Sequence, residues 1–461
     1  MRIVRWFFFL LVLAALAFGA AYYFAGSAAG PAITINQPTI IGRAGTLDVT
    51  IDAPAAELTA LNVELEQKGR TFHVVDLASA GDSLKRNGDR IRITRTIGKT
   101  TLPELENGPA RIRVTASRPV LRRLRQVSSE SSREVQVRLT PPRVSVVSTH
   151  HYVNQGGAEM LVYRVSPPDV DSGVRVGNMT YPGFPGKGAG LSDGELKVAF
   201  FALVYNQQPD TPMEVFARDA AGNEARAQFD HRVFPKVFRS SRIPVDDKFL
   251  SRVVPAILQS SPQIQASEND LLPAFLKINN DLRRLNNETI AALAKKTAPA
   301  ILWEGAFQTL GGSQVESSFA DFRTYLYDGK EVDRQVHLGF DLAKTANAPV
   351  TAANNGKVVF AEELGIYGNA VIIDHGLGVQ SLYGHLASFA VKEGDAVRKG
   401  QTLGNSGQTG LAGGDHLHFS MLVNGQFVNA TEWWDSHWME DRVTRKLREA
   451  GLPAQAAPPQ P

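Results

Sequence analysis

Four histidines and one aspartate in the last third of the chain have the residue types of a zinc hydrolase site. His337 and Asp341 stand four residues apart, His385 follows in a Tyr-Gly-His-Leu run, and His416 and His418 flank a single leucine. A catalytic zinc ion needs about three protein ligands and one open position for water, whose pKa it lowers to about 7. His337, Asp341 and His418 would supply the ligands. The two other imidazoles would supply a base and a partner for a developing oxyanion.

The spacing of these residues indicates how local structure would bring them together. In a strand, residues i and i+2 point to one face, so His416 and His418 would lie side by side. Gly339, between the first histidine and the aspartate, would permit a bend that directs both side chains to one ion. Either motif alone is common in proteins without a metal. All of them together, in order and within one β-rich segment, favour a metal site.

Composition predicts a globular protein of several folded units. The chain has 461 residues, a length that corresponds to about three domains. Of these residues 43% are hydrophobic and 21% are charged, as in globular proteins. It contains no cysteine, which excludes disulfides and thiolate metal ligands. The net charge of +3 suits association with anionic surfaces such as wall polymers or lipid headgroups. No run of basic residues interleaved with aromatic ones favours a nucleic acid partner.

The N-terminal segment predicts export from the cytoplasm. Arg2 and Arg5 precede an uncharged run from Trp6 to Ala25, which as a helix would span about 30 Å of bilayer hydrocarbon. The two arginines favour a cytoplasmic N-terminus. We therefore expect residues 1–28 to form a transmembrane signal anchor in the inner membrane, with the bulk of the chain in the periplasm. A cleaved signal peptide is the alternative.

Between the anchor and the site, the chain is expected to be mainly β. Alternating apolar and polar residues predict two β-sandwich-like, Ig-like modules, and a change to helical period predicts a connector after them. In the connector, Pro255 would kink or shorten the first helix and Asp270 would cap the second. The predicted parts are a β module over 31–141, an Ig-like β module over 142–240, a helical connector over 245–300, a β-rich domain over 302–434 that carries the site, a C-terminal helix over 435–449 and a disordered tail over 450–461.

A series of motifs between residues 312 and 434 is the most specific signal in the chain. In order they are His337-Leu-Gly-Phe-Asp341, Ala348-Pro-Val-Thr-Ala352, Gly368-Asn-Ala-Val-Ile-Ile-Asp-His375, Tyr383-Gly-His-Leu386, Val391-Lys-Glu-Gly-Asp-Ala-Val-Arg-Lys-Gly-Gln-Thr-Leu-Gly404, Gly407-Gln-Thr-Gly410 and His416-Leu-His-Phe419. In this combination the segment resembles the lysostaphin/LytM family of zinc endopeptidases, which cut peptide cross-links in peptidoglycan. The resemblance covers about a quarter of the chain.

The resemblance implies a two-sheet β fold with an open groove and a zinc ion held by His337, Asp341 and His418. It makes His385 and His416 the catalytic pair, which orients and deprotonates the water and stabilises the tetrahedral intermediate. The implied substrate is peptidoglycan, cleaved in its stem peptides or cross-links.

Two positions depart from the family pattern. The family often has Glu after the His-Leu-His-Phe run, where this chain has Ser420, and Pro near the end of the domain, where this chain reads Val428-Asn-Ala430. Neither position binds the metal, so the departures bear on substrate detail rather than on activity.

Two other functions compete with a zinc peptidase. Some members of the family have lost metal ligands and activate other wall hydrolases, so a non-catalytic scaffold is the main alternative. The presence of all three ligands and both catalytic histidines favours the enzyme. The segment 391–401 also resembles a hairpin of biotinyl or lipoyl carrier domains, but it lacks their modifiable lysine at a hairpin tip. In either function, the β modules would offer surfaces for protein partners.

Overall fold

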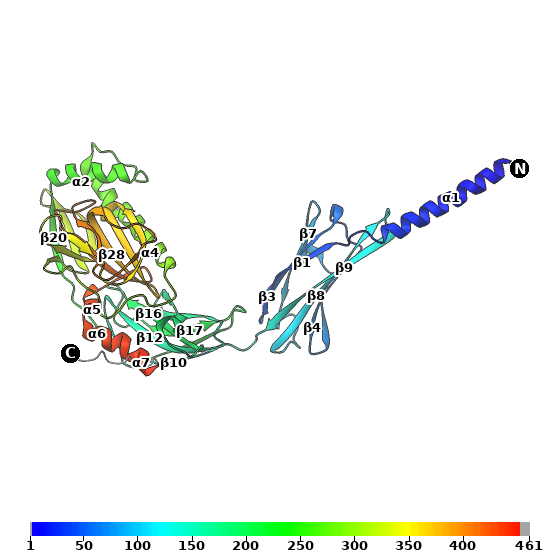
Figure 1. The fold of residues 1–461 in the computed structure, drawn as a ribbon, viewed down its shortest axis with the longest axis horizontal. Helices are drawn as coiled ribbons and strands as arrows, with labels where there is room; N and C mark the ends of the chain where they lie inside the picture. Colours follow the sequence, from blue (N-terminus) through cyan, green and yellow to red (C-terminus); the bar gives the residue numbers. More distant parts are fainter. Residues whose placement is uncertain (1, 452–461) are drawn as a thin grey trace. The chain divides into compact units, whose positions relative to one another are not determined.

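The computed structural model describes residues 2–451, and strands are its main element, as the sequence predicts (Figure 1). The chain divides into two compact units. The first comprises the chain up to residue 142 together with residues 218–224, and the second comprises the remainder. The finer division predicted from the sequence remains a prediction. Of the predicted disordered tail, residues 452–461 lie outside the described residues.

Helix α1 (Arg2–Ala25) is long and apolar enough to cross a membrane, and it is the only such helix within residues 2–451. It buries none of its side chains against the protein, although most of them are leucine, phenylalanine, alanine or valine. An uncovered apolar helix of this length needs another apolar surrounding. This is what a membrane anchor requires, and a signal peptide would meet the same criterion.

The first unit contains a β module of two sheets that share one apolar core. Its strands alternate as predicted: in β7 (Arg90–Ile97), Ile91 and Ile93 are buried while Arg92 is exposed. One sheet has the order β1 (Ala32–Gln37), β3 (Gly45–Asp52), β7, β6 (Leu84–Asn87), and the other β2 (Ile40–Ile41), β9 (Arg125–Val137), β8 (Gly108–Val120), β4 (Ala60–Gln67), β5 (Arg70–Asp76), with short turns η1 (Pro54–Ala56) and η2 (Gly81–Ser83) between strands.

The second unit begins with another β module, whose central strand β16 (Leu196–Leu203) is buried along its whole length. A strand buried on both faces reads as a continuous apolar run, which is why this segment shows no clear alternation. The module has a sheet β10 (Arg143–Val146), β12 (Gly157–Ser166), β16, β15 (Phe184–Pro185), a sheet β14 (Met179–Pro182), β13 (Asp171–Val176), β17 (Met213–Arg218), β18 (Glu224–Ala227), a parallel pair β11 (His151–Asn154) with β19 (His231–Phe234), and a turn η3 (Gly186–Ala189). The Ig-like topology stays a prediction.

A helical segment follows, as the change of period predicts. It contains α2 (Asp247–Ser260), α3 (Leu271–Lys277), η4 (Ile278–Leu282), α4 (Arg283–Leu293) and η5 (Ala294–Lys296). Pro255 does not end α2, which continues to Ser260 and buries Ile257 and Leu258 beyond the proline. The packing of this apolar stripe outweighs the one backbone hydrogen bond that proline removes. Asp270 occupies the N-cap of α3, but its side chain accepts no capping hydrogen bond.

The C-terminal part of the second unit is built on two sheets. The smaller has the order β20 (Ser240–Val245), β22 (Asp321–Tyr327), β23 (Lys330–His337). The larger runs β21 (Gln314–Ser317), β24 (Phe340–Ala343), β31 (Leu417–Val423), β28 (Val379–Phe389), β27 (Asn369–Gly376), β26 (Gly356–Glu363), β29 (Ala396–Val397), and it also includes β25 (Pro349–Thr351), β30 (Thr402–Ser406) and β32 (Gln426–Val428), with a turn η6 (Gly365–Tyr367).

Helix α4 covers one face of this larger sheet. Gln380 of β28 donates a hydrogen bond to the carbonyl of Leu293 at the end of α4 (3.2 Å), and Asn286 of α4 accepts one from the backbone of Ile366 (3.0 Å). Aromatic side chains cover the opposite face, where Trp434 stacks near Phe419 of β31. The central strands β28 and β31 are therefore buried on both sides, which makes them a rigid base for a site.

The described part of the chain ends in helices α5 (Ala430–Trp434), α6 (Ser436–Met439), η7 (Glu440–Thr444) and α7 (Arg445–Glu449), which lie alongside β12 (Figure 1). Buried charged groups make this contact. Lys446 donates to Glu159 at 2.7 Å, with both side chains almost fully buried. The Glu432 carboxylate accepts from the backbone of Ala158 at 2.8 Å and from Asn154 at 2.7 Å. Burial raises the pKa of Glu432 to about 7.

This raised pKa makes the stability of the contact depend on pH. The folded chain binds the Glu432 proton more tightly than the unfolded chain, whose pKa is about 4.5. The contribution to stability is therefore complete below about pH 4.5 and is lost as the pH rises through about 7, by up to about 3 kcal/mol. In Glu432→Gln, the denaturant midpoint of tryptophan fluorescence should change less between pH 5 and 8 than in the wild type. The exposed Glu362→Gln is the control, and an unchanged pH slope in Glu432→Gln would contradict the prediction.

Candidate metal centre

The register of two strands places Asp341 directly opposite His418. Strands β24 and β31 are antiparallel, and these two residues are paired across them. His337 ends the neighbouring strand β23. Gly339, between the strands, does not adopt a left-handed backbone. A Cβ at this position would instead lie 2.5 Å from His418 Nε2 and 2.6 Å from Ser420 Oγ, so glycine is required here for close approach rather than for the predicted bend.

Three donor atoms converge on one point. Asp341 Oδ1 lies 2.9 Å from His337 Nε2 and 3.1 Å from His418 Nδ1, and these two nitrogens are 3.0 Å apart. Ligands of a tetrahedral zinc ion, at bonds of about 2.0–2.1 Å, are separated by about 3.3 Å. The triangle is therefore close to the size that a zinc ion needs, and its two imidazoles and one carboxylate are a donor set found in catalytic zinc sites. The three residues that the sequence predicts as ligands fit a bound metal.

Each histidine of the triangle is oriented by a hydrogen bond at its other ring nitrogen. His337 Nδ1 lies 3.2 Å from the carbonyl oxygen of Ser318, to which it can only donate. Ser420 Oγ donates to the carbonyl of Leu338 (2.9 Å) and therefore accepts from His418 Nε2 (3.0 Å). Both imidazoles thus direct a lone pair into the triangle, which is the tautomer that binds a metal. Ser420, the departure from the family pattern, therefore orients the imidazole of His418.

A β-bulge directs His385 toward the triangle. In β28, Gly384 and His385 together face one residue of β27, and His385 has a left-handed backbone with φ of 62°. Regular alternation would place His385 on the same face as Tyr383, which packs against Phe419 on the far side of the sheet. Instead the His385 ring lies 5.7 Å from the ring of His418. The bulge is the local reason that this histidine belongs to the site, and the sequence pattern does not indicate it.

His416 completes the cluster, immediately before β31. As the His-x-His spacing predicts, it lies on the same side as His418, with Nε2 3.5 Å from Asp341 Oδ1. Its ring is 4.9 Å from the ring of His385. The Nδ1 atom of His416 donates to the carbonyl of Gly414 (2.9 Å), and that of His385 donates to the carbonyl of Thr409 (2.8 Å). In both residues Nδ1 is therefore committed to a backbone carbonyl, and Nε2 is the ring nitrogen that faces the cluster.

Burial and the shared carboxylate determine the electrostatics of the cluster. All five residues are less than a tenth exposed. Burial alone would raise the pKa of Asp341, but the surrounding imidazoles hold it well below its usual value. Burial lowers the pKa of His418 to about 4, and burial together with the neighbouring imidazoles holds the pKa of His385 well below its usual range. For His416, the Asp341 carboxylate outweighs burial and raises the pKa.

Sequence reasoning missed a charged residue at the centre. The Arg323 guanidinium on β22 donates to Asp341 Oδ2 at 2.9 Å and to Ser317 Oγ at 2.8 Å. Arg323 stands well before the motif that contains Asp341, and no spacing in the sequence connects the two. Only the pairing of β22 with β23, which ends at His337, makes them neighbours.

The helical segment reaches the loop that carries His416. Arg252 of α2 donates to the carbonyl of Ala412 (2.8 Å), four residues before that histidine. On α4, Asn287 accepts a hydrogen bond from the Tyr367 hydroxyl (3.0 Å), and the Tyr367 ring lies 5.4 Å from His418. The helices are thus connected to two sides of the histidine cluster.

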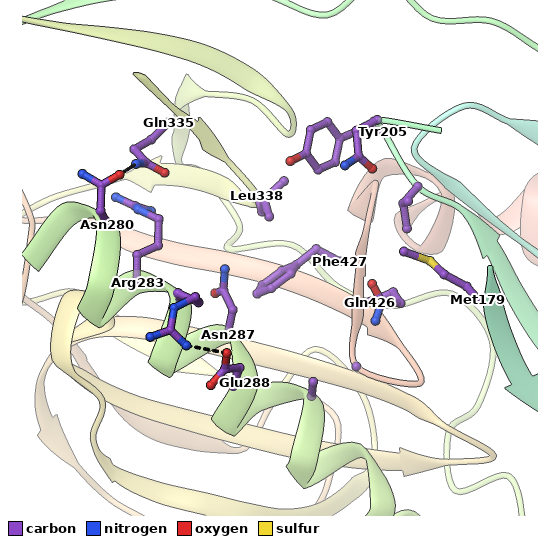
Figure 2. Close-up of a pocket in the computed structure, with 15 residues that line it drawn as sticks. Met179, Tyr205, Asn280, Arg283, Asn287, Glu288, Gln335, Leu338, Gln426 and Phe427 are labelled. Carbon is purple, nitrogen blue, oxygen red and sulfur yellow. Dashed lines mark hydrogen bonds and ion pairs between the residues drawn. The ribbon is translucent and has the colours of Figure 1, made fainter. Parts of the chain in front are cut away.

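A pocket of about 480 Å³ lies beside the cluster, where α4, the second β module and β32 meet (Figure 2). Leu338, next to His337 of the cluster, forms part of its wall, together with Phe427. Most of the other side chains that point into it are amides or charged groups, among them Arg283 and Asn287.

Comparison with known proteins identifies the domain that holds the cluster. Residues 335–430 match the sequence model of Peptidase family M23, which bears out the resemblance drawn from the motifs. Over 95 residues the chain is 44% identical to the DD-carboxypeptidase/endopeptidase Mpg of Neisseria meningitidis serogroup B, a match that covers 21% of this chain and 22% of Mpg.

Two further relatives match a stretch of similar length. The peptidoglycan DD-endopeptidase ShyA of Vibrio cholerae is 40% identical over 20% of this chain and 22% of its own length. The murein hydrolase activator EnvC of Escherichia coli is 36% identical over 21% of this chain and 23% of its own length. The chain therefore spans less than a quarter of the length of each relative.

Ser420 provides a test of how the ligands are positioned. Ser420→Ala removes the acceptor for His418 Nε2, so zinc affinity should fall about 10–100-fold, as for other groups that orient a ligand. Ser420→Thr keeps the hydroxyl and is the matched control. Competition with a metal-sensitive dye on the purified chain measures the affinity. Equal affinities for Ser420→Ala and the wild type would show that the hydroxyl does not position His418.

Proposed function

We propose that this chain, which contains a Peptidase M23 domain, is a zinc-dependent endopeptidase that hydrolyses stem peptides or peptide cross-links of peptidoglycan. The observation that carries the proposal is the convergence of His337 Nε2, Asp341 Oδ1 and His418 Nδ1 within 3.1 Å of one another, with two further imidazoles beside them. A scaffold without catalysis has no need of five buried, mutually oriented polar side chains, which cost stability unless each is paired.

The residues have separate roles in this mechanism. His337, Asp341 and His418 hold zinc, which when bound would lower the pKa of water and polarise the scissile carbonyl. His416 Nε2 takes the proton of the attacking water, because its Nδ1 is committed to the Gly414 carbonyl and Nε2 faces the carboxylate of Asp341. His385 is held in the same tautomer by Thr409, and it orients the water and stabilises the tetrahedral intermediate.

The proposed substrate rests on the relatives and on the pocket beside the site. The relatives include one protein named as a DD-carboxypeptidase/endopeptidase and another named as a peptidoglycan DD-endopeptidase. Stem peptides of peptidoglycan are polar and carry free carboxylates. The amide-rich pocket, with Arg283 and Arg284 in its lining, suits such a peptide.

The proposed location follows from α1. Its length and composition meet the requirement for a membrane span, and Arg2 and Arg5 favour a cytoplasmic N-terminus. We propose that α1 anchors the chain in the inner membrane, and that the β modules and the peptidase domain lie in the periplasm, where peptidoglycan is accessible. The β modules would then be available to protein partners.

The relative named as a murein hydrolase activator favours one second function. In that case the chain would bind another wall hydrolase and increase its activity without cleaving peptidoglycan itself. The difference is measurable: an activator alone releases no products from purified sacculi.

Digestion of purified sacculi tests the proposal. The detergent-solubilised full chain with zinc should release peptide fragments that mass spectrometry identifies as products of amide-bond cleavage, and a chelator should abolish their release. His418→Ala should lose both metal and activity. His416→Ala should keep the metal and lose activity by about 100-fold or more, which is typical for loss of a general base.

The exposed His437→Ala is the matched control and should act as the wild type does. Products released equally by His416→Ala, or no products from the wild type with zinc bound, would exclude the proposed enzyme. Release that occurs only when a second hydrolase is added would support the activator.

A further inference from the structure

The two oxygens of the Asp341 carboxylate have different partners. Oδ1 faces the ring nitrogens of His337, His418 and His416 at 2.9, 3.1 and 3.5 Å. Oδ2 lies 2.9 Å from Arg323 Nη2, the distance of a charge-assisted hydrogen bond. One oxygen is thus directed at the proposed metal position, while the guanidinium holds the other away from it.

Arg323 is itself fixed in place. Its side chain is only 20% exposed, and it lies on β22 between β20 and β23. Ser317 Oγ accepts from the same nitrogen that contacts Asp341, and the buried Asp321 carboxylate lies 3.6 Å from Arg323 Nε. Asp321 in turn accepts from the hydroxyl of Ser241 on β20 at 2.9 Å. The guanidinium therefore cannot swing away from Asp341 without breaking several buried polar contacts, which is costly.

The way in which a carboxylate binds zinc decides how many positions remain for water. A catalytic zinc site has three protein ligands and an open position. An aspartate that binds through one oxygen leaves that position free, whereas one that chelates through both oxygens fills it or crowds it. A cation bound to the second oxygen disfavours chelation, because it competes with the metal for the electron density of that oxygen and holds the carboxylate turned away.

We propose that Arg323 is a positioning residue that makes Asp341 a one-oxygen ligand and so keeps a coordination position free for water. The inference rests on the proposed metal-dependent function. It assigns to Arg323 no contact with the substrate and no proton transfer. It also explains why a permanently charged residue lies in a largely buried position beside a cationic metal. The negative charge of the Asp341 carboxylate, which lies between them, stabilises both positive charges.

Cobalt substitution tests this arrangement without any assay of activity. Cobalt(II) replaces zinc in such sites, and its visible absorption is strong in four-coordinate sites and weak at higher coordination. The full chain in detergent, loaded with cobalt(II), should give the strong four-coordinate spectrum. Arg323→Met, which keeps an unbranched side chain but removes the guanidinium and its charge, should give a weaker, higher-coordinate spectrum as Asp341 becomes free to chelate. Its zinc affinity should change by about tenfold or more.

Arg334→Met is the matched control, because Arg334 lies on the adjacent strand but is exposed and paired with Glu331. It should keep the wild-type spectrum. A four-coordinate spectrum in a folded Arg323→Met chain would overturn the proposal. So would a higher-coordinate spectrum in the wild type, a measurement that does not depend on the folding of any variant.

The outcome is separate from that of the sacculus experiment. A chain that cleaves peptidoglycan but shows no spectral difference in Arg323→Met would refute the role of Arg323 and leave the proposed function intact. A chain that shows the spectral difference but releases no products would refute the proposed peptidase function and leave the role of Arg323 intact.

Discussion

The buried carboxylate of Asp341 is the constraint on which the architecture of the site depends. An ionised carboxylate removed from water costs several kcal/mol unless charges and hydrogen bonds replace its hydration. Each neighbouring element supplies one of these replacements. Strand β31 supplies His418 through its register with β24, β23 supplies His337 at its end, and β22 supplies Arg323. The two sheets of the C-terminal part meet where these contributions converge.

Backbone carbonyls, more than side chains, set the orientation of the imidazoles. His337, His385 and His416 each have Nδ1 beside a carbonyl oxygen, those of Ser318, Thr409 and Gly414. The loops that provide these carbonyls are therefore part of the site. One of them is held from outside the sheet, since Arg252 of α2 donates to the carbonyl of Ala412. The helical segment thus stabilises the geometry of the site without contributing a side chain to the cluster.

The sequence predicts the types and order of the five residues in the cluster, because metal ligands and bases are limited to a few residue types whose spacing reflects strands and turns. It does not predict the groups that act across strands. Arg323 and Ser420 carry no motif, since any polar residue could occupy either position until the register is known. The bulge at His385 is equally hidden, because its β28 sequence reads as a regular strand. At Asp270 the sequence predicts an interaction that the structure does not contain. This residue occupies the N-cap of α3, but its side chain does not make the capping hydrogen bond.

The strand β20 shows that the site depends on more of the chain than its motifs cover. The family resemblance begins near residue 312, and the predicted β-rich domain begins at 302, yet all six residues of β20, Ser240–Val245, pair in parallel with β22. Parallel strands need a long connection between them, which here is the helical segment that packs on the larger sheet. Ser241 of β20 donates to Asp321, which lies beside Arg323, and Arg323 holds Asp341. The strand that leaves the second β module is therefore three contacts from the proposed metal ligand, so a displacement of this strand would reach the Asp341 carboxylate through Asp321 and Arg323.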